Sequence, residues 1–151
     1  MNRHSFLYGN DPTDYTKQAV RGQRVFCSDR GQRGGCGHTF ALFLADILPR
    51  HTVRASLLWQ LLCLLLTGGS IQAAVATLGR SLALETFYRL LRRLRRHLDR
   101  IRPCLCQRQK PPASVEADPL FHTVRHFQAV FATAACPLQE FQLVFARPLL
   151  S

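Results

Sequence analysis

The sequence predicts a mainly α-helical fold with a small β-structured region at the N-terminus. Apolar residues recur at helical spacing in segments that begin near Leu57, Phe87 and Leu120. Two short segments, QRVFC and HTFALF, are typical of strands on either side of a Gly-rich loop. We therefore expect a β-knuckle over 1–50, a three-helix unit containing a helix-turn-helix over 51–102, a linker over 103–118 and a helical extension over 119–151.

Length and charge limit the classes of function. A chain of 151 residues with 47% hydrophobic residues can bury one core. Twenty basic residues against 9 acidic ones give a net charge of +11, which favours a polyanionic partner, nucleic acid first and an acidic membrane surface second. The first residues lack the apolar core of a signal peptide, and the longest apolar run, Leu57 to Leu66, is shorter than the ~20 residues that span a bilayer. We expect a cytoplasmic, nucleoid-associated protein with no membrane partner.

Capping residues divide the central region into three helices. Thr52 can cap a first helix, which Thr67-Gly68-Gly69 ends. Ser70 can cap a second helix that Gly79 ends, and Ser81 a third that Pro103 ends.

The C-terminal region predicts two further helices. Asp118 and Pro119 form a cap and first-turn pair. One apolar stripe follows, made of Leu120, Val124, Phe127 and Phe131. Pro137 opens a last helix with Phe141, Val144 and Phe145 facing inward. Two helices are too few to stand alone, so we expect them to dock on the central bundle.

The third helix separates apolar side chains from arginines. At about 100° per residue, with Phe87 at zero, one apolar arc lies within about 60° of Phe87 and an arginine arc spans about 140° to 240°. The apolar arc consists of Leu90, Leu91, Leu94, Leu98 and Ile101, and the arginine arc of Arg89, Arg92, Arg93, Arg96 and Arg100. If the apolar arc is buried, the arginines face outward and repel one another unless an anion neutralises them.

DNA would supply such an anion. Because recognition helices contact bases mainly through their first turns, we assign Thr86, Arg89 and Arg93 to base edges. Arg92, Arg96 and Arg100 suit phosphates, as does Tyr88 on the flank of the arc. A solvated charged face is the alternative interpretation.

The segment from Gly68 resembles the helix-turn-helix of bacterial transposases and their relatives. The residues that carry the resemblance are Gly68 or Gly69, Ser70, Ala73, Ala74, Gly79, Ser81, Thr86, Phe87, Tyr88 and Arg89. Cys36-Gly37-His38-Thr39-Phe40 is similar to one knuckle of a zinc ribbon, and short transposase-related proteins pair such a ribbon with a helix-turn-helix. The combined similarity covers roughly residues 3–101.

The resemblance implies a zinc site with Cys27 and Cys36 as ligands, completed in those proteins by an upstream C-x-x-C pair. No such pair precedes Cys27 in this chain, so the site is incomplete. Several interpretations of the incomplete site are open. The true start of the chain could lie upstream, the chain could be a remnant that has lost its metal, or the two cysteines could simply be reduced thiols. Other residues could also supply the missing ligands: His4, His38, Cys104 or Cys106. Arg21, Arg24, Arg30 and Arg33 surround the knuckle and could contact phosphates.

The sequence contains none of the following patterns that are typical of enzymes. The 9 acidic residues do not form the carboxylate cluster that a two-metal nuclease needs, and there is no H-E-x-x-H, Walker loop or G-x-S-x-G. His122 and His126 are four residues apart on one helix face, and we interpret them as surface histidines.

We therefore expect a DNA-binding protein related to transposase recognition domains, without its own nuclease site or an evident small-molecule substrate. Its partners would be duplex DNA and either a second copy or a separate transposase subunit. The alternatives are a helical interaction or oligomerisation module whose basic face meets an acidic partner, an RNA-binding protein, and the recognition piece of a split transposase.

Overall fold

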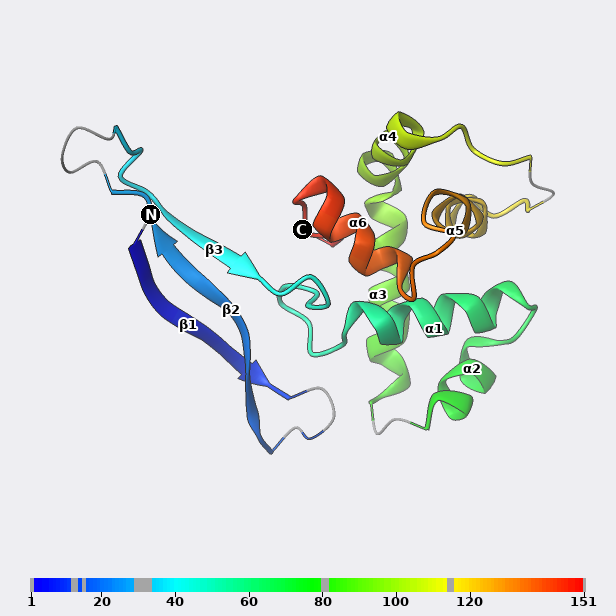
Figure 1. The fold of residues 1–151 in the computed structure, drawn as a ribbon. Coiled ribbons are helices and arrows are strands. Elements are labelled where there is room, and N and C mark those ends of the chain that lie inside the picture. The colour runs from blue at the N-terminus through cyan, green and yellow to red at the C-terminus, as the bar shows by residue number, and fades with distance from the viewer. Residues whose placement is uncertain are drawn as a thin grey trace. The chain divides into compact units, whose positions relative to one another are not determined.

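The computed structural model describes residues 2–11, 14, 16–28, 34–79, 82–113 and 116–150. The chain divides into two compact units, residues 1–54 and 55–151. The first unit contains a small antiparallel sheet and the second contains the helices, which confirms the predicted mainly α-helical class with an N-terminal β-region (Figure 1).

The sheet of the first unit has three strands in the order β1-β2-β3. They are β1 (Asn2–Asn10), β2 (Gln18–Phe26) and β3 (Thr39–Phe43), each antiparallel to its neighbour. The two predicted strand segments fall on β2 and β3, whereas β1 was not predicted. Gly22 lies where β2 and β3 approach closely, since a Cβ there would clash with the Leu42 carbonyl oxygen.

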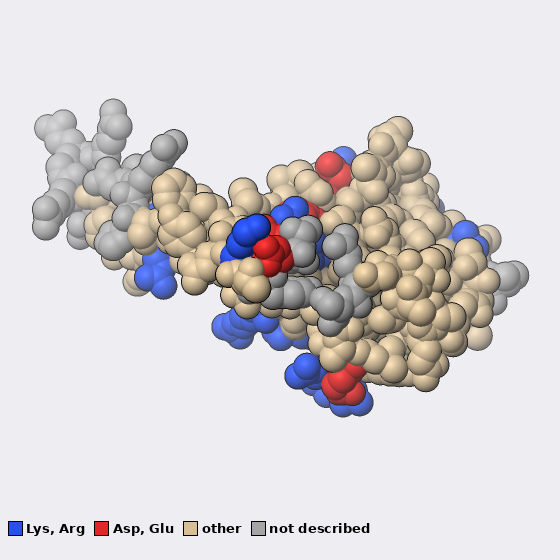
Figure 2. Space-filling view, turned by 90° about the horizontal axis from the view of Figure 1, so that it is seen from below, with Lys and Arg blue, Asp and Glu red and all other residues tan. Residues whose placement is uncertain are grey.

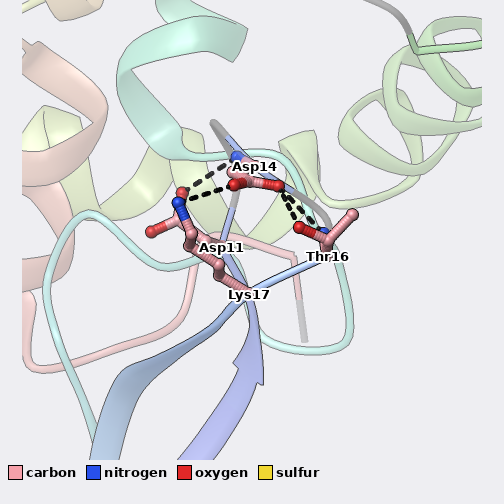
Figure 3. Close-up of polar contacts among 4 residues, drawn as sticks. All are labelled: Asp11, Asp14, Thr16 and Lys17. Atoms are coloured by element: carbon pink, nitrogen blue, oxygen red, sulfur yellow. Dashed lines mark hydrogen bonds and ion pairs between the residues drawn. The ribbon is translucent and has the colours of Figure 1, made fainter.

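The turn between β1 and β2 is organised by Asp14 (Figure 3). One carboxylate oxygen accepts hydrogen bonds from the backbone N–H and hydroxyl of Thr16, at 3.1 and 2.6 Å, and the other lies 3.0 Å from Lys17 Nζ. Asp11 accepts a hydrogen bond from the Asp14 N–H. Such local side-chain bonds to the backbone fix a turn without burying apolar surface.

The second unit contains six helices within its described residues. They are α1 (Ala55–Leu66), α2 (Ile71–Leu78), α3 (Leu84–Arg96), α4 (Leu98–Arg108), α5 (Pro119–Val130) and α6 (Pro137–Phe145). Helix α2 packs on α1 and α3, α4 packs on α3 and α5, and α1 contacts both α5 and α6. The docking of the C-terminal helices on the central helices is therefore confirmed.

Two predicted helix boundaries are confirmed by capping hydrogen bonds, and a third is confirmed by its backbone conformation. The Ala73 N–H donates to the Ser70 hydroxyl at 3.2 Å, and Gly79 ends α2 in the left-handed conformation at φ 57°. The Leu120 N–H donates to Asp118 at 2.8 Å. Ser81 lies outside the described residues, and the N-cap position of α3 is Ala83, whose side chain makes no capping bond.

The predicted end of the third helix at Pro103 is wrong, and so is the linker over residues 103–108. Helix α3 ends at Arg96, His97 caps both α3 and α4, and α4 continues to Arg108 with Pro103 inside it. A proline in a helix interior costs about 3 kcal/mol. Cys104 and Leu105, which follow it, are buried. Burial of these apolar side chains offsets the cost of the proline, which rules based on local sequence treat as enough to end the helix.

An aromatic cluster joins the C-terminal helices to α1. The Trp59 and Phe127 ring centroids lie 6.5 Å apart, and those of Phe127 and Phe141 lie 5.5 Å apart, both edge to face. Two predictions fail here: Val144 is exposed rather than inward, and His126 is buried rather than on the surface. No helix within the described ranges is long and apolar enough to cross a membrane.

Candidate nucleic-acid interface

The apolar arc of α3 and α4 is buried as its spacing predicts. All of its members are at most 7% exposed: Phe87, Leu90, Leu91, Leu94, Leu98 and Ile101. Leu98 and Ile101 follow the break at His97, so the break does not rotate the buried side away from the core. This burial fixes which side of the two helices can meet a partner.

The arginine arc lies on the opposite, accessible side. Four of its members are exposed and one is half-buried: Arg89, Arg92, Arg96 and Arg100, and then Arg93. Arg95, which falls outside the arc, forms an ion pair with Asp118 at 2.8 Å.

Two uncharged candidates flank the first turn of α3. Tyr88 is 38% exposed, so its hydroxyl is accessible to a ligand. Thr86 is half-buried, and its backbone N–H donates to the Ala83 carbonyl, which fixes the start of the helix. Thr86, Tyr88 and Arg89 therefore share the N-terminal end of α3, the part of a recognition helix that contacts bases.

The pKa of His97, at the junction of α3 and α4, is affected by the positive charges of the arc. Burial lowers the pKa of this imidazole, and the charges of Arg100 and Arg93 lower it further. The imidazole is therefore neutral at a pH where an ordinary histidine is partly protonated.

The predicted arginines of the N-terminal unit differ in accessibility. Arg24 is exposed. The Arg21 guanidinium donates to the His51 carbonyl, and burial followed by the neighbouring Arg54 charge lowers its pKa. Arg21 thus holds backbone in its own unit, a role that the sequence did not indicate. Arg30 and Arg33 lie outside the described residues.

Hydrogen bonds join the two cysteines of the predicted knuckle. The Cys36 N–H donates to Cys27 Sγ at 3.4 Å, and two backbone bonds close the loop, from the Cys27 N–H to the His38 carbonyl and from the Gly37 N–H to the Cys27 carbonyl, both at 2.9 Å. An amide directed at sulfur favours a thiolate. Within the described part of the chain, however, no three His, Cys, Asp or Glu side chains are grouped to hold a metal ion.

Other histidines and cysteines of the chain have different roles or positions. The side chain of His4 lies outside the described part of the structure. Cys104 is buried, and its thiol donates to the Arg100 carbonyl at 3.3 Å. His126 Nε2 lies 2.8 Å from the Gln109 carbonyl oxygen, which accounts for its burial.

The chain matches no protein-family model, no curated protein and no solved structure. The residues and their geometry are therefore the evidence for function. Figure 2 shows Lys and Arg side chains in clusters at the surface, with acidic side chains beside some of them. The face of α3 and α4 that carries the arginine arc holds five arginines, and exposed Glu85 in the first turn of α3 lies within the same span.

Proposed function

We propose that the chain binds duplex DNA through the arginine arc of α3 and α4, as a recognition module of the transposase-related kind without its own nuclease site. The observation that carries the proposal is the opposition of a buried apolar arc and an accessible arginine arc on one helical segment. A helix held in this way can enter a major groove with its cationic side outward.

The order of the helices supports the proposal. Helix α2 is short, ends at a left-handed Gly79 and packs on α3, and these features are typical of a helix-turn-helix. Helix α3 then presents Thr86, Arg89 and Arg93 for base edges. Arg92, Arg96 and Arg100 lie along the same side for phosphates, with Arg24 as a further phosphate contact.

Selection of bound sequences from a random duplex pool tests the proposal. We expect an enriched motif, and we expect Arg89→Gln and Arg93→Gln to relax base preference at particular positions, at a cost of about 1–3 kcal/mol each. Running the selection with and without a chelator also tests the zinc prediction at Cys27 and Cys36. A motif that disappears with chelator would indicate a metal that holds the N-terminal unit.

Three competition arms separate the alternatives. Preference for single strands or A-form duplex over B-form DNA would favour RNA binding. Binding to an acidic polypeptide in preference to DNA would favour the protein-interaction module. Affinity for DNA that does not change with salt would contradict the role of the arginine arc, because phosphate binding releases counterions.

A further inference from the structure

A cavity lies in the second unit where the junction of α3 and α4 faces the segment that follows α6. Its volume is about 200 Å³, and it is open to solvent on one side. The lining residues are His97, Arg100, Ile101, Phe141, Arg147, Pro148 and Leu149. The sequence did not indicate this site, because its two walls are separated by a helix–loop–helix segment of the chain.

The polar side chains among the described lining residues are all basic. Arg100 and Arg147 are exposed, His97 is half-buried, and no carboxylate side chain belongs to the described lining. The Arg147 guanidinium lies against Cys104, with Nη1 4.0 Å from Sγ. Two arginines that line one opening supply the donors and the positive charge that a carboxylate or phosphate group binds.

The inner part of the lining is apolar. Ile101, Phe141 and Leu149 are at most 2% exposed. The wall formed by the C-terminal segment is held in place by two features. Ala146 turns the chain in the left-handed conformation at φ 48°, and the Leu149 N–H donates to the buried Gln142 side chain at 2.9 Å. A non-glycine residue in this conformation is uncommon and costs energy that the surrounding contacts must offset.

We propose that this cavity binds a small organic acid, with its acidic group between Arg100 and Arg147 and its apolar body against Phe141 and Ile101. A cavity of about 150 Å³ can hold benzene, so the volume here fits a single ring that carries a charged group. His97 adds a hydrogen-bonding group beside the anion. A few convergent polar groups over an apolar base are typical of ligand sites.

Benzoate is the probe for the full chain, with binding followed by NMR chemical shifts of backbone amides. We expect the largest shifts at the lining residues, and about tenfold tighter binding of benzoate than of neutral benzamide, as for loss of one charge-assisted hydrogen bond. Acetate and inorganic phosphate test the need for the ring, and phenyl phosphate tests which acidic group is preferred. Acetate binding as tightly as benzoate would overturn the proposal, as would no shift at the lining.

Two variants locate the acidic group. Arg147→Gln should weaken benzoate binding about tenfold, and Arg100→Gln by a similar factor. Arg108→Gln removes an exposed arginine of α4 that does not line the cavity, and it should leave binding unchanged. Equal losses of benzoate affinity in all three variants would show that binding depends only on net charge, and would contradict the site. Arg147 is not part of the arginine arc, and the titration contains no DNA, so this test fails or succeeds independently of the proposed function.

Discussion

The salt dependence of DNA binding should fall by a defined amount when one phosphate-contacting arginine is removed. We assign three exposed arginines of the arc to phosphates: Arg92, Arg96 and Arg100. Each neutralised phosphate contributes about −0.9 to the slope of log K against log salt, so these three arginines together contribute a slope of about −2.7. Through these three contacts, raising salt from 50 to 200 mM would weaken binding about 40-fold.

Arg96→Gln should reduce that slope to about −1.8, so that the same change in salt weakens binding only about 12-fold. The assay is fluorescence anisotropy with a labelled duplex that carries the selected motif, repeated at several salt concentrations. Arg108→Gln is the matched control, because it removes an equal charge from the end of α4. Since Arg96 is exposed, its replacement should change the free energy of unfolding by no more than about 0.5 kcal/mol. An unchanged slope in Arg96→Gln, or equal changes in both variants, would refute the assignment of Arg96 to a phosphate.

Three further predictions concern the fold and the local charge. Asp118→Ala should lower the free energy of unfolding by about 1–2 kcal/mol through loss of the α5 cap. Burial raises the pKa of Asp118, but hydrogen bonds from Arg95 and the Leu120 N–H lower it below its ordinary 3.8. In urea unfolding, the loss of stability caused by Asp118→Ala should therefore be full at neutral pH and disappear as pH falls through that lowered pKa. Phe127→Ala should cost about 3–5 kcal/mol in the same assay, since it empties the centre of the aromatic cluster. Arg100→Gln should raise the pKa of His97 in an NMR titration, because a neighbouring positive charge is removed; an unchanged or lower value would contradict the proximity of the two side chains.

The features that were predictable from the sequence depend on neighbouring residues. Ser70 and Asp118 cap helices through side-chain bonds that span two or three residues, and local chemistry determines such bonds. The buried side of α3 follows from apolar spacing alone, because a helix places Phe87, Leu90 and Leu94 on one side whatever covers them. The accessible arginine arc is the other half of the same periodicity.

The features that were missed depend on contacts between distant segments. Strand β1 has few alternating apolar residues and gains its hydrogen bonds from β2, so its own pattern does not identify it. His126 is buried because it bonds to the carbonyl of Gln109, which precedes α5 in another segment. Helix α4 continues past Pro103 because Cys104 and Leu105 are covered by other parts of the unit. Local rules carry no information about such coverage.

Arg100 connects the two proposed sites through the geometry of α4. At about 100° per residue from Phe87, Arg100 lies at about 220°, within the arginine arc, whereas Cys104 lies at about 260°, just beyond the arc, and is buried. The boundary between the accessible and the covered side of α4 therefore runs beside Arg100, where the C-terminal segment and Arg147 form the cavity wall. An acid bound there would neutralise a charge that the arc would otherwise offer to a phosphate. One guanidinium cannot satisfy both anions fully, so the cavity and the DNA face compete for Arg100 rather than act independently.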